Sequence, residues 1–216
     1  GASAIKFQTF IAKKSISKFA KKAKYQIIST GSKKNQLELI ENLELSESDH
    51  FRILEECKKN NIEFISTPFD KESINLLIKM KVTKIKVASS ELNNLPFLKK
   101  IAKTKKNIIV STGMGTLDEV KTALNVFKKN GLNKDKISVL HCNTAYPTPF
   151  ENANLRAIKT IKNRLKVKTG YSDHTPGIEA SIAAVVLGAE IIEKHFTLDK
   201  NLPGPDHKSS IDPIEL

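Results

Sequence analysis

The sequence lacks tryptophan, has only two cysteines and contains no long apolar run. Cys57 and Cys142 lie far apart without the spacing of metal ligands, which fits a reducing compartment better than a disulfide scaffold. The longest apolar run, 182–187, is much shorter than the ~20 residues that a membrane-spanning helix needs. We therefore expect a cytoplasmic protein that has no membrane partner.

Arginine is also scarce, although the formal net charge is +13. Only three of the 36 basic residues are arginine, the side chain that binds phosphate and base edges through two parallel hydrogen bonds. The lysines occur as scattered pairs, such as Lys21-Lys22 and Lys128-Lys129, near the ends of expected helices, where cations are favoured. We therefore expect a solvated, lysine-rich surface and no nucleic-acid partner.

The sequence does contain a series of short β-branched runs, each followed by a helical pattern. Thr116 with Glu119, and Ser46 with Asp49, have the spacing of capping boxes and predict helices that begin there. Alternating strands and helices of this length predict a parallel sheet. Because no glycine-rich dinucleotide fingerprint is present, we favour a TIM (β/α)8 barrel over a doubly wound sheet. The expected strands are 4–9, 62–67, 84–89, 108–112, 137–142, 167–172 and 190–196.

A barrel of this type needs an eighth strand. The chain leaves a helix and enters a strand at 188–192, and residues 1–5 have the same pattern. A first strand and first helix are therefore expected upstream of residue 1, and we assign residues 1–216 to an incomplete TIM-barrel domain with strands 2 to 8. The span 10–61 has stretches rich in Lys, Ser and Asn and is expected to form an inserted loop over the barrel mouth.

Polar residues stand at the carboxyl ends of the expected strands, which is where TIM barrels carry their chemistry. Because burying an unpaired charge is costly, Lys, Glu and His on otherwise apolar strands indicate a site. His174 and His195 end adjacent strands and could hold one divalent ion, with water or substrate completing its coordination. The alternative for each is a core histidine whose hydrogen bonds are satisfied.

A second group of strand-end residues suits a dianionic phosphate, because it combines hydroxyls with positive charge. Ordinary strand-end hydrogen bonding is the alternative. Glu91 is a candidate acid or base unless it only pairs with a lysine. Asp206 stands in a rigid Pro/Gly turn, where it could bind hydroxyls or serve only as a turn residue. The phosphate group of residues consists of Lys6, Thr67, Lys86, Ser89, Ser111 and Ser172.

Several of these residues fall in longer sequence blocks. The blocks are Lys6-Phe7-Gln8-Thr9-Phe10, Ser66-Thr67-Pro68-Phe69-Asp70, Ser111-Thr112-Gly113-Met114, Tyr146-Pro147-Thr148-Pro149, Gly170-Tyr171-Ser172-Asp173-His174-Thr175, Glu193-Lys194-His195-Phe196-Thr197-Leu198-Asp199-Lys200 and Gly204-Pro205-Asp206-His207. In combination they resemble the sialic acid synthase family over essentially the whole chain. The resemblance implies a TIM barrel joined to a small C-terminal antifreeze-like (SAF) domain, in a domain-swapped homodimer. Neither the family's upstream acidic strand nor the SAF domain has a counterpart in residues 1–216, so this stretch alone is expected to be inactive or nearly so.

The resemblance also implies a metal-dependent transferase that condenses phosphoenolpyruvate. Its members join phosphoenolpyruvate to N-acetylmannosamine, or to a related 2,4-diacetamido-trideoxyhexose, and with water give a nine-carbon 2-keto sugar acid and phosphate by C–O cleavage. By this resemblance His174 and His195 hold Mn²⁺, Mg²⁺ or Co²⁺, which activates the aldehyde, and Glu91 is the carboxylate near the reacting carbons. The phosphate group defined above would bind phosphoenolpyruvate, and the sugar contacts would be Gln8, Asn143, Tyr146 and Asp206.

Other functions stay open on the sequence alone. The same chemistry with other acceptors would give legionaminate or pseudaminate, and the run 204–208 resembles the sialate and legionaminate branch more closely. A Schiff-base aldolase that uses Lys86 or Lys194 is a second class. A non-catalytic, polysaccharide-related protein is a third, although the presence of both histidines and of the phosphate group argues against it.

Overall fold

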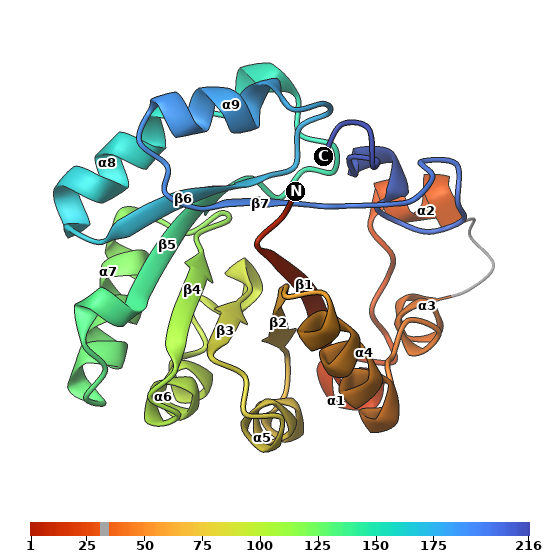
Figure 1. Cartoon of the computed structure of the whole chain (residues 1–216), viewed down its shortest axis with the longest axis horizontal. Coiled ribbons are helices and arrows are strands. Elements are labelled where there is room, and N and C mark those ends of the chain that lie inside the picture. Colours follow the sequence, from red (N-terminus) through yellow and green to blue (C-terminus); the bar gives the residue numbers. More distant parts are fainter. Residues whose placement is uncertain (31–34) are drawn as a thin grey trace.

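The strands of the computed structural model form one parallel sheet in chain order. The structure describes residues 1–30 and 35–216, so positions 31–34 of the expected insertion lie outside the described residues. Within these ranges the seven-stranded sheet runs from β1 to β7, and every neighbouring pair is parallel. The sheet is curled, with helices on its outside (Figure 1). The strands are β1 (Ala4–Thr9), β2 (Glu63–Pro68), β3 (Lys84–Val87), β4 (Asn107–Ser111), β5 (Ile137–Cys142), β6 (Lys168–Asp173) and β7 (Ile192–Lys194).

The expected strands are confirmed, with one or two residues of difference at the ends of five of them. The expected strand 84–89 stops earlier because Ser89–Glu91 form a 3₁₀ turn. The expected strand 190–196 is shorter at both ends, since β7 pairs with β6 over only three positions. Among the described residues, no helix combines the length and the apolar character needed to cross a membrane.

Helices follow the strands and cover the outer face of the sheet. Both expected capping boxes are present, because the side chain of Ser46 accepts from the Asp49 N–H and that of Thr116 accepts from the Glu119 N–H. Val110 of the sheet and Leu98 and Phe127 of two helices belong to one buried apolar cluster, and this burial holds the helices against the sheet. The helices are α4 (Glu47–Lys59), α5 (Lys71–Lys79), α6 (Leu95–Lys103), α7 (Leu117–Lys129), α8 (Arg156–Leu165) and α9 (Glu179–Val186).

The expectation of an inserted loop over 10–61 is wrong for the described part of that span. It contains α1 (Ala12–Ser15), α2 (Lys24–Thr30) and α3 (Gln36–Glu41) before α4 begins. A capping box between Asn35 and Glu38 begins α3. The side chain of His50, on α4, is hydrogen-bonded to Thr9 at the end of β1, at 2.9 Å. Polar contacts at helix starts and strand ends therefore give this segment structure where its composition suggests a loop.

The inner face of the sheet has an apolar layer beneath a polar one. Ile65, Ile109 and Leu140 pack together there, with Ala4 and Ile191 against them. Two residues further along a strand, a side chain returns to the same face, one layer closer to the carboxyl end. The inner face therefore carries a layer of polar side chains, here called the polar layer, directly above a layer of apolar side chains, here called the apolar floor. The members of the polar layer directly above the floor residues are Lys6, Thr67, Ser111, Cys142 and Glu193.

Candidate active site

The polar layer is centred on the carboxylate of Glu193. Its Oε1 accepts a hydrogen bond from Ser172 Oγ at 2.8 Å and lies 3.4 Å from Lys6 Nζ and 3.6 Å from Lys86 Nζ. Lys86 Nζ also donates to Ser111 Oγ at 2.7 Å. Four residues of the expected phosphate group are therefore brought together, and the contact between Lys6 and Glu193 joins the two edge strands, β1 and β7.

The charges of this layer are strongly coupled. Lys86 is only 3% exposed, and burial lowers its pKa although Glu193 opposes that effect. Burial would by itself raise the pKa of Glu193, but Lys86, Lys6 and the hydroxyl of Ser172 outweigh it and lower the pKa to about 2. The carboxylate is therefore ionised at neutral pH, and two ammonium groups share its negative charge. An anion that enters the layer meets positive charge and hydroxyl donors.

Two neutral imidazoles stand beside the polar layer. The rings of His174 and His195 lie edge to face, with centroids 5.4 Å apart. His174 Nδ1 is 2.7 Å from the carbonyl oxygen of Asn143, which can only accept, so Nδ1 carries the proton and Nε2 keeps its lone pair. Burial lowers the pKa of His174, and burial, together with Lys6 and His174, lowers the pKa of His195 to about 3. Neutral imidazole is the form that binds a metal ion.

Tyr146 and Asp206 border the histidine pair. The Tyr146 ring centroid lies 4.3 Å from that of His174 and 5.7 Å from that of His195. Asp206 Oδ2 lies 3.9 Å from His195 Nδ1, and burial raises the pKa of the Asp206 carboxyl. Its other oxygen, Oδ1, is buried without a hydrogen-bond partner. Two of the expected sugar contacts therefore adjoin the expected metal ligands.

The donors at this position fit a divalent cation with open coordination positions. In residues 1–30 and 35–216 no group of three or more His, Cys, Asp or Glu side chains is arranged to hold a metal. The two-histidine metal site stays a prediction from the sequence, in which His174 and His195 would supply two nitrogen ligands and substrate or water would supply the rest. The unpartnered, buried Asp206 Oδ1 adds an oxygen acceptor next to them, suited to a metal-bound water or a sugar hydroxyl.

Two further expected residues present buried polar atoms without protein partners. Thr67 is 2% exposed, and its Oγ1 has no hydrogen-bond partner. Asn143 donates from Nδ2 to the Asn152 carbonyl oxygen at 2.7 Å, while its Oδ1 is buried and unpartnered. Because an unsatisfied buried polar atom costs free energy, these atoms are explained if a ligand satisfies them.

The other three expected site residues lie outside the group of hydrogen bonds and ion pairs around Glu193 described above. Gln8 is exposed on the inner face, one layer above Lys6. Glu91 is part of the 3₁₀ turn and accepts a hydrogen bond from Asn94 Nδ2 at 2.7 Å. Ser89, in the same turn, lies so close to Gly113 that a Cβ there would come within 2.4 Å of the Ser89 Cβ. Gly113 is thus needed for the close approach of the loops after β3 and β4.

Glu193 is the central residue that the sequence interpretation missed. It stands in the block 193–200, in which the sequence interpretation assigns roles to Lys194 and His195 but none to Glu193. Strand alternation was the available signal, because Glu193 lies two residues before His195 on the same face of the chain. Lys194, between them, faces the other side and pairs with the buried Asp173 at 2.9 Å.

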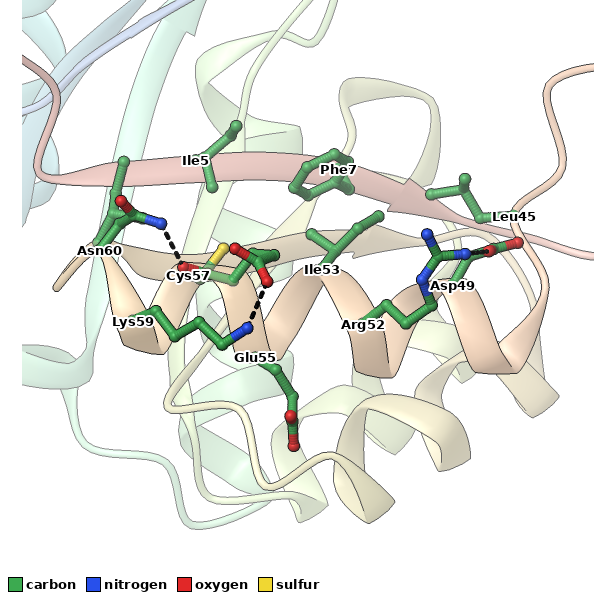
Figure 2. Close-up of a pocket in the computed structure, with 12 residues that line it drawn as sticks. Ile5, Phe7, Leu45, Asp49, Arg52, Ile53, Glu55, Cys57, Lys59 and Asn60 are labelled. Carbon is green, nitrogen blue, oxygen red and sulfur yellow. Dashed lines mark hydrogen bonds and ion pairs between the residues drawn. The ribbon is translucent and has the colours of Figure 1, made fainter.

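A separate cavity of about 800 Å³ lies on the outer face, between β1 and α4. Ile5 and Phe7 line it from the strand, and Ile53 and Cys57 line it from the helix (Figure 2). These strand residues alternate with Lys6, so they point away from the polar layer. The cavity is therefore not part of the candidate site.

The sequence profile of the NeuB family matches residues 1–216. The N,N'-diacetyllegionaminic acid synthase of Campylobacter jejuni is 52% identical over 216 residues, which are 100% of this chain and 65% of that protein. The N,N'-diacetyllegionaminic acid synthase of Legionella pneumophila is 44% identical over 219 residues, covering 100% of this chain and 61% of that protein. The chain thus spans less than two-thirds of the length of these relatives.

A solved structure matches the fold as well. It is the N-acetylneuraminic acid (sialic acid) synthetase of Leptospira borgpetersenii in complex with citrate, 36% identical to this chain. The two superpose with a TM-score of 0.87, covering 99% of this chain and 69% of the other. The expected α/β fold of the TIM-barrel type is confirmed, here as a curled sheet with seven strands in the described residues.

Proposed function

Because this chain belongs to the NeuB family, we propose that it forms the phosphoenolpyruvate-binding barrel of a synthase that makes a nine-carbon 2-keto sugar acid. The favoured product is N,N'-diacetyllegionaminate, from 2,4-diacetamido-2,4,6-trideoxymannose, since two of its relatives carry that name. The observation that carries the proposal is the lysine and hydroxyl layer around Glu193, directly beside two neutral imidazoles.

Phosphoenolpyruvate would bind in the polar layer through its negative charges. Lys86 is buried, so its ammonium group has few partners other than Ser111, Glu193 and an entering anion. The side chain of Lys6 is 24% exposed and can turn towards the phosphate from the mouth. Thr67 Oγ1 would donate its unused hydrogen bond, and Ser89 and Ser172 would complete the hydroxyl set.

The acceptor sugar would bind next to the histidines. His174 and His195 would hold Mn²⁺, Mg²⁺ or Co²⁺, which when bound acts as a Lewis acid on the open-chain aldehyde. The Asn143 carbonyl oxygen keeps the proton on His174 Nδ1. Asp206 would accept hydrogen bonds from sugar hydroxyls through its unpartnered Oδ1, and the remaining proposed sugar contacts are Gln8, Asn143 and Tyr146.

The condensation forms one C–C bond and breaks one C–O bond. C3 of phosphoenolpyruvate attacks the aldehyde carbon, and positive charge develops at C2. Water adds at C2, and the tetrahedral intermediate collapses with loss of inorganic phosphate. An ionised carboxylate in the phosphoenolpyruvate layer stabilises positive charge at C2, and we assign this role to Glu193 because its pKa is lowered to about 2. Glu91 remains a further proposed carboxylate near the reacting carbons.

A Schiff-base aldolase is the second candidate, because burial lowers the pKa of Lys86 and so favours a nucleophilic amine. Lys194 is less suited, since its ammonium group is held by Asp173 and by the Thr175 carbonyl oxygen. Borohydride reduction in the presence of pyruvate would trap an adduct on Lys86 if this candidate were right. We further propose a homodimer, as the family resemblance implies, and a location in the cytoplasm, as the scarcity and spacing of the cysteines suggest.

The deciding experiment uses the purified full-length protein, with the upstream strand and the SAF domain that the family resemblance implies. It is supplied with phosphoenolpyruvate, Mn²⁺ and each of three sugars: N-acetylmannosamine, the diacetamido-mannose above, and its altrose isomer. We expect sugar-dependent release of phosphate and a product mass equal to that of the acceptor plus pyruvate. With ¹⁸O in the bridging oxygen, C–O cleavage leaves the label in the phosphate. Reactions without sugar are the control. No phosphate release with any sugar, or trapping of a pyruvate adduct, would overturn the proposal.

A further inference from the structure

A buried ion pair lies directly behind the two imidazoles. Lys194 Nζ is 2.9 Å from Asp173 Oδ2, and the two side chains are 7% and 0% exposed. Asp173 and Lys194 are also register partners across β6 and β7. Each is followed in the chain by one of the histidines. One ion pair therefore connects the two strand ends that carry His174 and His195.

The same two side chains hold the backbone of Thr175, the residue that follows His174. Asp173 Oδ1 accepts from the N–H and from the Oγ1 of Thr175, each at 2.8 Å. Lys194 Nζ donates to the Thr175 carbonyl oxygen at 2.6 Å. Ser181 Oγ, on α9, donates to Asp173 Oδ2 at 2.6 Å and ties the helix to the same carboxylate. The turn through His174 is thus closed by Asp173 and Lys194.

The segment that carries His195 follows β7 directly, and just beyond the strand the His195 carbonyl oxygen accepts a hydrogen bond from the Ile211 N–H at 2.8 Å. β7 has three residues and pairs with β6 alone among the described strands. A buried ion pair adds little net stability, because desolvation offsets the attraction, but its directional contacts specify geometry. We infer that Asp173 and Lys194 are positioning residues that set the separation and orientation of His174 and His195. The inference rests on the proposed metal-binding role of the two histidines.

Measurements of metal binding test the positioning role of Asp173 and Lys194 without requiring enzymatic turnover. The purified protein is titrated with Co²⁺, and affinity is measured by calorimetry while ligand geometry is followed by visible absorption. Lys194→Met keeps the length of the side chain and removes the ammonium group. We expect Co²⁺ to bind at least about tenfold more weakly, with an altered absorption band, as for other residues that orient metal ligands. Lys162→Met is the matched control, because Lys162 forms an exposed ion pair with Glu190 at 3.2 Å and should not change Co²⁺ binding.

Two more variants distinguish a positioning role of Asp173 and Lys194 from an effect of unfolding on Co²⁺ binding. The double variant Asp173→Asn/Lys194→Met removes both charges, so no unpaired charge stays buried if Lys194→Met alone unfolds. Leu98→Ala destabilises the outer core far from the site and should leave Co²⁺ affinity unchanged below its unfolding temperature. Wild-type affinity in the folded Asp173 and Lys194 variants would overturn the inference while leaving the proposed function intact. Failure of the wild-type protein to bind Co²⁺ would instead remove the proposed metal role, and the inference with it.

Discussion

Lys86→Met is the substitution for which the structure predicts the most specific kinetic effect. The change removes the buried ammonium group but keeps most of the apolar side chain, so the strand β3 retains its packing. Ser111 loses a hydrogen-bond donor, and Glu193 keeps Lys6 as a counter-charge at 3.4 Å. The perturbation is thus confined to the layer proposed to bind phosphoenolpyruvate.

The magnitude follows from the contact that is lost. A hydrogen bond to a charged group contributes about 1.5–3 kcal/mol. Loss of the proposed hydrogen bond from Lys86 to phosphoenolpyruvate would therefore raise KM for this substrate roughly 10- to 150-fold. Removing one partner of a buried ion pair costs about 3–5 kcal/mol when the other charge is left alone. Because Lys6 remains beside Glu193, we expect a loss of folding stability at or below the lower end of that range.

Phosphate release by the full-length protein, at varied phosphoenolpyruvate and fixed, saturating sugar, is the appropriate assay. We expect KM for phosphoenolpyruvate to rise while KM for the sugar stays close to the wild-type value. Lys168→Met is the control, since Lys168 is exposed at the start of β6. An unchanged dependence on phosphoenolpyruvate in a folded Lys86→Met protein would refute the assignment of the layer.

Three further outcomes are expected. His195→Ala should abolish activation of turnover by Mn²⁺ while leaving the unfolding midpoint close to wild type, as measured by circular dichroism; undiminished metal activation would contradict the ligand assignment. Thr116→Ala should lower the free energy of unfolding by about 1 kcal/mol in urea, because it removes the side-chain cap of α7; an unchanged midpoint would show that the cap contributes nothing. Burial would raise the pKa of Glu63, but hydrogen bonds from Lys84 and Thr83 lower that pKa below its ordinary value of 4.5. The ionised Glu63 side chain therefore stabilises the fold above pH 4.5, and this stabilisation is lost as the pH falls towards the folded-state pKa. Glu63→Gln should therefore flatten the acid-side loss of stability, and equal slopes in the two proteins would count against the ion pair with Lys84.

Much of the fold is predictable because local sequence patterns determine where the strands and the longer helices form. The runs at 4–9 and 137–142 form strands with those bounds, since β-branched residues and a buried face favour the same extended conformation. The turn at Ser89–Glu91 packs closely against Gly113, which is distant in sequence, and a local pattern does not contain that neighbour. The helix α1 was missed because it has only four residues and no side-chain cap.

The candidate site was predictable in its residue types and less so in its contacts. The histidines and lysines stand out because charge on apolar strands is rare. The roles of Glu193 and of the Asp173–Lys194 pair depend on which strands are neighbours and in what register, information that no single segment contains. Glu91 stays a prediction, since its side chain accepts a hydrogen bond from Asn94, three residues later in the chain.

The apolar floor beneath the polar layer has a consequence for changing the specificity of this protein. Ile65, Ile109 and Leu140 pack together one layer beneath the polar side chains. Under the proposed function, the residues that would contact the acceptor sugar differ from the residues of the apolar floor that stabilise the fold. A library that varies the loops after β5 and β7 would change the proposed sugar contacts while the apolar floor stays unchanged. Directed evolution of sugar specificity could therefore proceed without loss of the packing that stabilises the sheet.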